Sequence, residues 1–382
     1  MTHTMAGNAS ALPDPWREAL RGRAPTIERA PLGDRHVLYS PTSGAILTTD
    51  DLGLAILSDP VAPLHGASSL PSAIVDEILR AWEGAGLFDT APQPFPDPVA
   101  DDGHQAGHRR GYATRQRVFS VETDDLVLAR QLDEILWAFA STSSVPGPGG
   151  RSLRCVACAG GGLGVFHNGR ALWGRASLDV ARYLIVREAA EALCGADRVG
   201  AVLHGAAVLG SRGALLIVGD SGRGKSTLAQ GLINAGCGFL ADDHLPLHVD
   251  GQRLLAFPTG SAIKSGARDL GEVRRLVSLH GRLANSREGV SYLPLEAAAA
   301  PGKAIPLAVI VFPEHAAGAE MQMTRMAPEA AFVAAIASGS RPSRRQARIA
   351  PLVELFATVP AYALRYGTLA QSVPACLDLL AA

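Results

Sequence analysis

Residues 213–244, GALLIVGDSGRGKSTLAQGLINAGCGFLADDH, form the stretch that determines the fold. The stretch begins with an apolar run, Ala214 to Val218, which is short enough for a buried parallel strand. Gly219 to Ser226 then match the phosphate-loop pattern G-x-x-x-x-G-K-[ST] at every fixed position. Apolar residues follow at helical spacing until Gly236, which is placed to end a helix. The sequence therefore predicts a strand, a phosphate-binding loop and a helix in succession.

The residue types of this loop suit a polyphosphate. Glycines let the backbone adopt positive φ angles and bring its N–H groups close to phosphates, and the helix N-terminus adds the positive end of its dipole. We expect the Lys225 ammonium to reach the β- and γ-phosphates. The residues expected to contact the nucleotide are Gly219, Asp220, Ser221, Gly222, Arg223, Gly224, Lys225, Ser226 and Thr227. The alternative, a glycine-rich turn with a chance lysine, is disfavoured because strand, loop and helix occur in order.

Two adjacent acids follow one helix after the loop. Phe239 to Ala241 form a short apolar run, and Asp242 and Asp243 come directly after it, where we expect a turn. An α/β nucleotide site places its metal ligand or base at the end of a strand that neighbours the phosphate loop. Two acids allow one to hold Mg²⁺ while the other accepts a hydroxyl proton. In the alternative, structural interpretation the pair caps or turns the chain.

These features together resemble the catalytic domain of HPr serine kinase/phosphorylase. The segments that carry the resemblance are Leu203-His204-Gly205, the glycine-led strand, GDSGRGKST at 219–227 and ADD at 241–243. The chain is more similar still to the HPr-kinase-like proteins encoded with ribosomal peptide pathways, lasso-peptide pathways among them. The resemblance implies an α/β P-loop kinase domain of the HPr kinase/PEP carboxykinase-like fold, with ATP and Mg²⁺ as cofactors. It is closest over residues 202–266 and looser over 116–382.

The resemblance also implies roles for individual residues. The catalytic cluster that it implies consists of His204, Asp242, Asp243 and Lys225. The implied metal ligands are Ser226 and Asp242, and which acid is the base stays open. No counterpart of the family's I-E-x-R-G segment follows the acids, so the resemblance does not extend to the phosphorolytic back-reaction.

Lys264 is a further candidate. It lies in Ser261 to Gly266, a motif that recurs in these kinase-like proteins, so we expect it to contact the transferring phosphate or the acceptor. A solvated lysine is the alternative. The Arg- and Gly-rich residues 268–304 show little periodicity and are predicted to form an acceptor-side loop.

Composition excludes several classes of protein. The 382 residues give a net charge of −1, which does not favour bulk attraction to nucleic acid or to an anionic membrane. No apolar run approaches the roughly 18 residues of a membrane-spanning helix, and residues 1–26, a disordered leader by composition, lack the apolar core of a secretion signal. Five cysteines do not suggest a disulfide framework, and Cys155 and Cys158 lack the partners that would complete a zinc site. We expect a cytoplasmic protein and leave homo-oligomerisation open.

Residues 27–90 predict a small winged-helix-like α+β domain. Three short strands, with a turn at Ser40 to Gly44, precede two helices, one capped by Asp50 or Asp51. This order resembles the PqqD-like domains of ribosomal peptide pathways, which bind an extended leader peptide as an added strand. The implied partner of residues 27–90 is therefore a precursor peptide. Dimerisation or DNA binding is the alternative, although Arg80 is the only basic residue of the second helix.

The remaining organisation and the function follow from these parts. Residues 91–115 are predicted to be a linker, because Pro, Gly, Asp and His crowd together without periodicity, and 116–382 the catalytic domain. We expect an ATP-dependent serine kinase that phosphorylates a hydroxyl of a precursor peptide. The alternatives are a kinase of a small metabolite or of an HPr-like carrier protein, and a non-catalytic ATP-gated switch.

Overall fold

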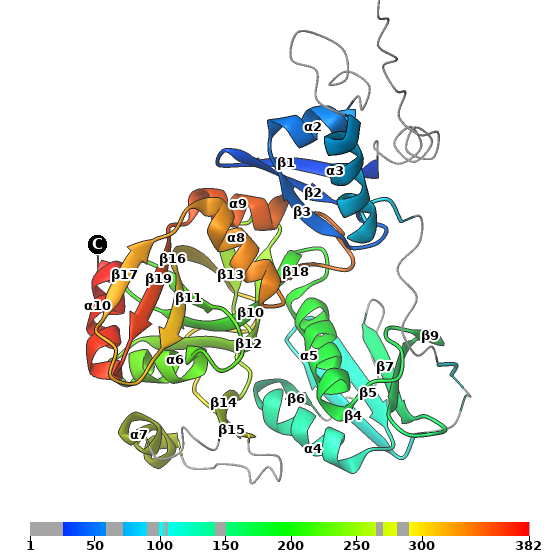
Figure 1. The fold of residues 1–382 in the computed structure, drawn as a ribbon. Coiled ribbons are helices and arrows are strands. Elements are labelled where there is room, and N and C mark those ends of the chain that lie inside the picture. Colours follow the sequence, from blue (N-terminus) through cyan, green and yellow to red (C-terminus); the bar gives the residue numbers. More distant parts are fainter. Residues whose placement is uncertain are drawn as a thin grey trace, which may run out of the picture.

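The computed structural model describes residues 26–58, 72–89, 99–101, 103, 106–141, 150–264, 270–280 and 290–381. These residues form a mixed α/β structure with separate sheets along the chain (Figure 1). Almost all of the expected leader, and residues 91–98 of the expected linker, lie outside the described part. Among the described residues, no helix combines the length and the apolar character needed to cross a membrane.

The N-terminal unit is a three-stranded antiparallel sheet with two helices. The elements are β1 (Glu28–Leu32), β2 (Arg35–Tyr39), β3 (Ile46–Thr49), α2 (Asp51–Ser58) and α3 (Ser72–Gly84). The Asp50 carboxylate accepts a 2.9 Å hydrogen bond from Gly53 N and so caps α2. β2 is the central strand, which leaves β1 and β3 as edges.

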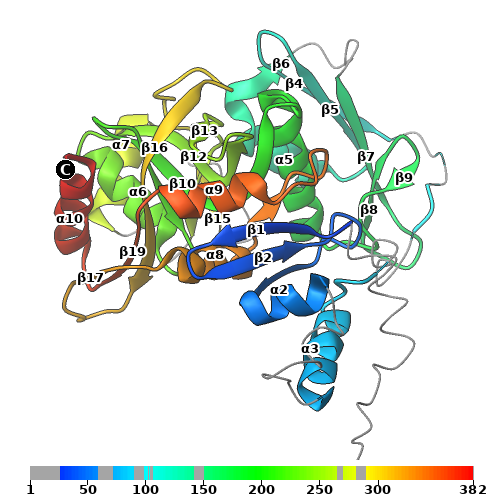
Figure 2. The ribbon, with the colours of Figure 1, turned by 90° about the horizontal axis from the view of Figure 1, so that it is seen from above.

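Both faces of this sheet are buried. Leu38 packs with Ile56, Val75 and Trp82 against α2 and α3. On the opposite face Leu32, Val37 and Tyr39 join the large core cluster of the rest of the chain. Figure 2 shows β1 and β2 lying along α8 (Pro328–Ala337) and α9 (Ala350–Thr358). The N-terminal sheet is therefore packed onto the part of the chain that carries α8 and α9, and β1 contacts α9.

A six-stranded sheet follows in the order β6-β4-β5-β7-β8-β9. Its strands are β4 (His108–Ala113), β5 (Val118–Thr123), β6 (Ala140–Ser141), β7 (Arg151–Ala157), β8 (Leu163–His167) and β9 (Arg170–Ala171). The prediction of a structureless linker over 91–115 is wrong for β4, which pairs with β5 along its whole length. The pairing buries Tyr112 against Phe119. The other residues of β4 are mostly polar, so the sequence lacks the alternation of apolar and polar residues that predicts a strand.

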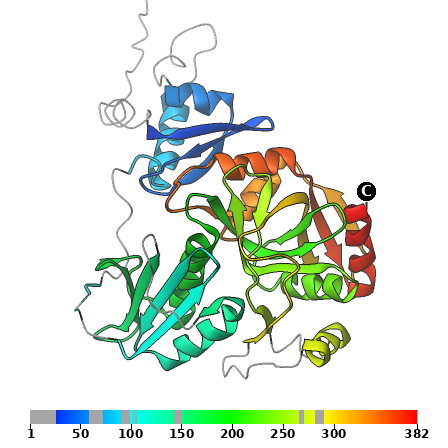
Figure 3. The same cartoon turned by 180° about the vertical axis from the view of Figure 1, so that it is seen from behind.

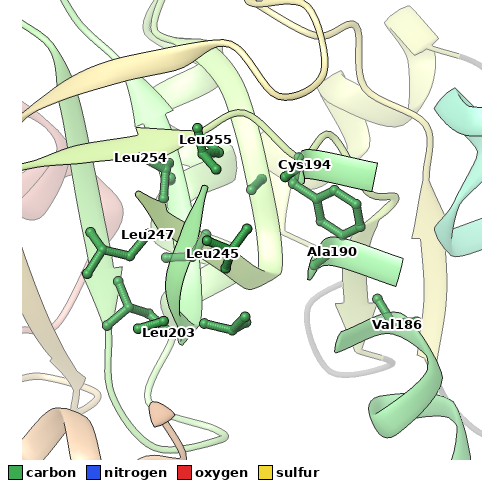
Figure 4. Close-up of a cluster of buried hydrophobic side chains, with 14 of the residues drawn as sticks. Val186, Ala190, Cys194, Leu203, Leu245, Leu247, Leu254 and Leu255 are labelled. Atoms are coloured by element: carbon green, nitrogen blue, oxygen red, sulfur yellow. The ribbon is translucent and has the colours of Figure 1, made fainter. Parts of the chain in front are cut away.

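Helices α4 (Leu126–Ile135) and α5 (Leu178–Cys194) cover one face of this sheet (Figures 1 and 3), and the short 3-10 helix η3 (Trp137–Phe139) follows α4. Helix α5 is buried on most sides, because it also packs against the larger sheet. Figure 4 shows Val186, Ala190 and Cys194 facing Leu245 and the leucines around it. This contact joins the two sheets into one core and brings α5 to the edge of the candidate site.

The larger sheet has the path β11-β10-β12-β13-β16-β19-β17, with β18 paired to β10. Its strands are β10 (Val199–Leu209), β11 (Ala214–Val218), β12 (Gly238–His248), β13 (Arg253–Leu255), β16 (Ala304–His315), β17 (Gln322–Arg325), β18 (Arg341–Pro342) and β19 (Ala361–Tyr366). Because β11 pairs with β16 as well as with β10, five of these strands close a ring. Helices α6 (Lys225–Asn234) and α10 (Leu369–Ala381) pack together beside it.

The expected acceptor-side loop over 268–304 contains regular structure, which corrects that prediction. Helix α7 (Gly271–His280) packs on α6, and β15 (Val290–Leu293) pairs with β14 (Ser261–Lys264). Val273 and Leu276 are buried with Phe239 and Ile263 in a small cluster. Elements as short as these carry too little periodicity to be recognised from sequence.

Candidate functional site

The loop between β11 and α6 has the backbone that a phosphate loop needs. Gly219, Gly222 and Gly224 have φ angles of 144°, 86° and 94°, values that favour glycine. A Cβ added at Gly219 or Gly222 would meet no atom within 4 Å, so both glycines border open space. The Lys225 Nζ donates a 2.9 Å hydrogen bond to the carbonyl of Asp220, which holds the ammonium against the loop.

The strand pairing sets the neighbours of this loop. β11 pairs with β10 on one side and with β16 on the other; β12 lies beyond β10, and β19 beyond β16. Asp242 in β12 is opposite Ala206 in β10, which is opposite Ile217 at the end of β11. The acids and the phosphate loop therefore lie at the same end of the sheet.

Asp242 is buried and fully bonded. Only 1% of the surface of this residue is exposed. Oδ1 accepts hydrogen bonds from Ser226 Oγ and Asp243 N, both at 3.0 Å. Oδ2 accepts from Ser261 Oγ at 3.0 Å and from Ala262 N at 2.9 Å. Burial, and next the charge of Asp243, raise the pKa of Asp242 to about 7.

Asp243 has a different setting. Its φ is 64°, a left-handed conformation that a residue other than glycine rarely adopts, and the ladder with β10 continues through it to Leu245. The expectation of a turn after the acids is therefore wrong, because β12 runs on to His248. The Asp243 side chain lines the cavity, and its carboxylate accepts no hydrogen bond within the described part of the chain.

The charge of Asp243 acts on the pKa values of both Lys225 and His204. Burial lowers the pKa of Lys225, while the Asp243 charge favours its ammonium. Burial, and next the charge of Lys225, lower the pKa of His204, so its neutral form is favoured. The backbone N–H of His204 donates to Ser340 Oγ at 3.3 Å.

His244 and Tyr183 belong to the site, although sequence reasoning did not select them. His244 is opposite His204 in the β10–β12 ladder, and its ring lies 4.8 Å from that of Tyr183 in α5. Neither ring nitrogen of His244 has a hydrogen bond of ordinary geometry in the described residues. Burial lowers its pKa to about 4, against the smaller opposing effect of Asp243. The only signal in the sequence is its position directly after the acids.

A cavity of about 790 Å³ connects these groups. The predicted site residues that line it are His204, Ser221, Gly222, Gly224, Lys225, Ser226, Thr227, Asp242, Asp243 and Lys264. Lys264 Nζ donates a 2.9 Å hydrogen bond to Ser221 Oγ, which places the second ammonium at the loop. Tyr292 and the α5 residues Asp179, Arg182 and Tyr183 form the wall beyond the acids.

Three predicted loop residues do not line the cavity. Gly219 and Asp220 contribute through the backbone. The Arg223 side chain pairs with Glu314 at 3.2 Å and is half exposed.

The groups present fit a magnesium–triphosphate complex. Ser226 Oγ and Asp242 Oδ1 are adjacent oxygen donors of the type that Mg²⁺ prefers, and two ammonium groups lie at a loop that borders open space. Within the described residues, no group of three or more His, Cys, Asp or Glu forms an all-protein metal site. Mg²⁺ is usually bound by one or two protein groups together with substrate phosphates.

No protein-family model matches the chain, and no curated protein matches it in sequence.

Proposed function

We propose that the protein is a P-loop kinase with the HPr kinase/PEP carboxykinase-like fold, which transfers the γ-phosphoryl group of ATP to an alcohol. One observation carries the proposal: a phosphate loop whose serine bonds to a buried carboxylate, while the next residue presents an unbonded carboxylate to the same cavity. Nucleotide binding needs only the loop, but the second acid gives the site a proton acceptor.

The roles of the two acids follow from their surroundings. Asp242 accepts four hydrogen bonds and is nearly inaccessible, so it cannot meet the acceptor; we assign it to the metal side of the site, where it orients the Ser226 hydroxyl. The Asp243 carboxylate is unbonded in the described residues and lines the cavity, so it accepts the proton of the acceptor hydroxyl. Neutral His204, beside Asp243, orients the same hydroxyl.

The remaining groups bind and neutralise charge. The magnesium nucleotide supplies the phosphoryl group and the cation that offsets its negative charge. Lys225 and Lys264 place two ammonium groups at the loop, where they stabilise charge on the transferred group. The α5 residues and Tyr292 line the cavity beyond the acids, on the side that we assign to the acceptor.

Transfer of label from γ-labelled ATP, with and without a candidate peptide, tests the proposal. Asp243→Asn should lower the transfer rate by about 100-fold or more while nucleotide affinity is kept. Nucleotide binding without any phosphoryl transfer by the wild-type protein would instead leave a nucleotide-gated switch. That switch, and a kinase of a small metabolite or of a carrier protein, are the competing functions.

We propose further that the acceptor is a serine of a ribosomally made precursor peptide, held by the N-terminal unit. The supporting observation is that β3 is an edge strand with no partner on one side among the described residues, which allows an added strand. β1, the other edge, lies against α9.

The packing of this unit determines how the peptide proposal is tested. Deletion of residues 1–100 would expose the apolar residues that cover Leu32, Val37 and Tyr39, so a loss of activity would not report on recognition. Thr48→Pro in β3 removes one edge N–H instead and should raise the peptide KM about tenfold, with ATP-dependent transfer to a free small acceptor unchanged. An unchanged peptide KM would contradict recognition at β3.

A further inference from the structure

The candidate cavity extends past the phosphate loop on the side away from the acids. There it is lined by His315, Tyr366 and the first residues of α10. His315 ends β16 and Tyr366 ends β19, so both lie at the same edge of the sheet as the loop. None of these residues is used by the phosphoryl-transfer site described above.

The strand order separates two halves of the cavity. β12 and β10 lie on one side of β11, and β16 and β19 lie on the other. Asp243 and Tyr366 are each two strands away from β11, but they are reached through different neighbours, β10 for Asp243 and β16 for Tyr366. In-line transfer requires the acceptor oxygen and the leaving nucleotide on opposite sides of the transferred group. With the acceptor at Asp243, the β16–β19 side is left for the nucleoside.

Contacts with α6 bring this second half close to the loop. A Cβ added at Gly224 would lie 2.6 Å from Tyr366 Oη, and one added at Gly231 would lie 3.4 Å from Leu369. Thr227 lies one turn before Gly231 and so shares its helix face. The start of α10 therefore borders Thr227, the residue that follows the loop serine, and both line the cavity.

The chemistry of the wall suits a flat, partly apolar ring. The His315 ring lies 5.5 Å from that of Tyr366, and its Nε2 donates to the carbonyl of Gly367 at 3.2 Å, which fixes the ring. His315 is exposed and Leu369 is half-buried, so both offer surface to a ligand. The Gly367 and Thr368 N–H groups both donate to Gln371 Oε1 at 3.1 Å, and Tyr366 is buried, so recognition falls to the His315 ring and Leu369.

We propose that His315 and Leu369 form the subsite for the nucleoside of the bound triphosphate, with the base stacked on His315 and the buried Tyr366 packed behind that ring. The proposal rests on the proposed function, because it assumes that the loop binds a triphosphate. It assigns the β16–β19 side to the donor and the α5 side to the acceptor.

Comparison of Mg–ATP with Mg–tripolyphosphate tests the subsite, because the second ligand has no base. Calorimetric titration of the full chain should give tighter binding of ATP. His315→Ala should weaken ATP binding about tenfold and leave tripolyphosphate binding unchanged, whereas His315→Phe should keep the preference for ATP. Val333→Ala, an exposed apolar residue of α8 outside the cavity, is the matched control.

The outcomes separate this subsite from the kinase proposal. Equal affinity of the wild-type protein for the two ligands would overturn the subsite and leave triphosphate binding intact. An effect of His315→Ala on the peptide KM, with ATP affinity unchanged, would place the acceptor on this side and overturn the assignment. If neither ligand binds, both proposals fail.

Discussion

The hydroxyl of Ser226, at the start of α6, donates a 3.0 Å hydrogen bond to Asp242 Oδ1 in β12. β12 reaches the helix that follows β11 because β10 pairs with both β11 and β12. Their contact joins the phosphate loop to the carboxylate that we propose as a metal ligand.

Ser226→Ala removes this hydroxyl and should raise the Mg²⁺ concentration needed for half-maximal transfer by about 10-fold to 100-fold. Ser226→Thr keeps a hydroxyl and should stay close to wild type. The measurement is a magnesium titration of labelled-phosphate transfer. The same Mg²⁺ dependence in Ser226→Ala and wild type would remove Ser226 from the metal site.

Gly224→Ala tests the shape of the loop. The new Cβ would lie 2.6 Å from Tyr366 Oη at a φ of 94°, so the loop has to move and ATP affinity should fall at least tenfold. Gly236→Ala is the control, because Gly236 has a similar φ of 103° but open space around it. It should cost only about 1 kcal/mol of stability and leave ATP binding intact. Equal losses of ATP affinity in the two variants would contradict this account.

His244 gives the stability of the metal-free protein a pH dependence. Its pKa falls from 6.5 to about 4 on folding, so below pH 6.5 the unfolded state binds more protons than the folded state. This group should therefore remove roughly 3 kcal/mol from the free energy of unfolding as the pH falls from 6.5 to 4.

His244→Phe keeps a ring against Tyr183 but cannot bind a proton. Urea denaturation at several pH values in the presence of a chelator should show a smaller acid loss for this variant than for wild type. Parallel curves for the two proteins would show that His244 does not contribute.

Glu28 connects the N-terminal unit to α9. Its Oε2 accepts a 2.9 Å hydrogen bond from Ile349 N, and its Oε1 lies 3.8 Å from Arg348 Nε. Glu28→Ala should lower the free energy of unfolding by about 1 kcal/mol, as the loss of a helix cap does. Asp34→Ala, in an exposed turn, should change it by less than about 0.5 kcal/mol. Chemical denaturation measures both, and equal effects would argue against the cap.

The sequence was most informative where function requires particular residues at fixed spacing. The loop from Gly219 to Ser226 needs glycines, a lysine and a hydroxyl in order, so the strand, loop and helix were predicted correctly. β4 was not predicted because Tyr112 is its only buried aromatic residue and the charged Arg109 and Arg110 come before it. The turn predicted after Asp243 was wrong because a positive φ lets the ladder pass through that residue.

Contacts between residues on different strands and helices could not be predicted from the sequence. The hydrogen bond between Ser226 and Asp242, and the ring contact between Tyr183 and His244, depend on the register of β10 with β12 and on the docking of α5. Nothing in the local pattern of α5 distinguishes Tyr183 from a core aromatic residue.

The close packing of the N-terminal sheet on α8 and α9 bears on the length of the substrate. Because this packing holds the N-terminal sheet in place, the distance between β3 and the Asp243 carboxylate is fixed. A peptide held at β3 would have to bridge that span to present its serine. The distance between the two sites would then set a minimum length for the peptide segment between the recognised strand and the acceptor serine. Shortening that segment below the minimum should abolish phosphorylation, whereas lengthening it should be tolerated.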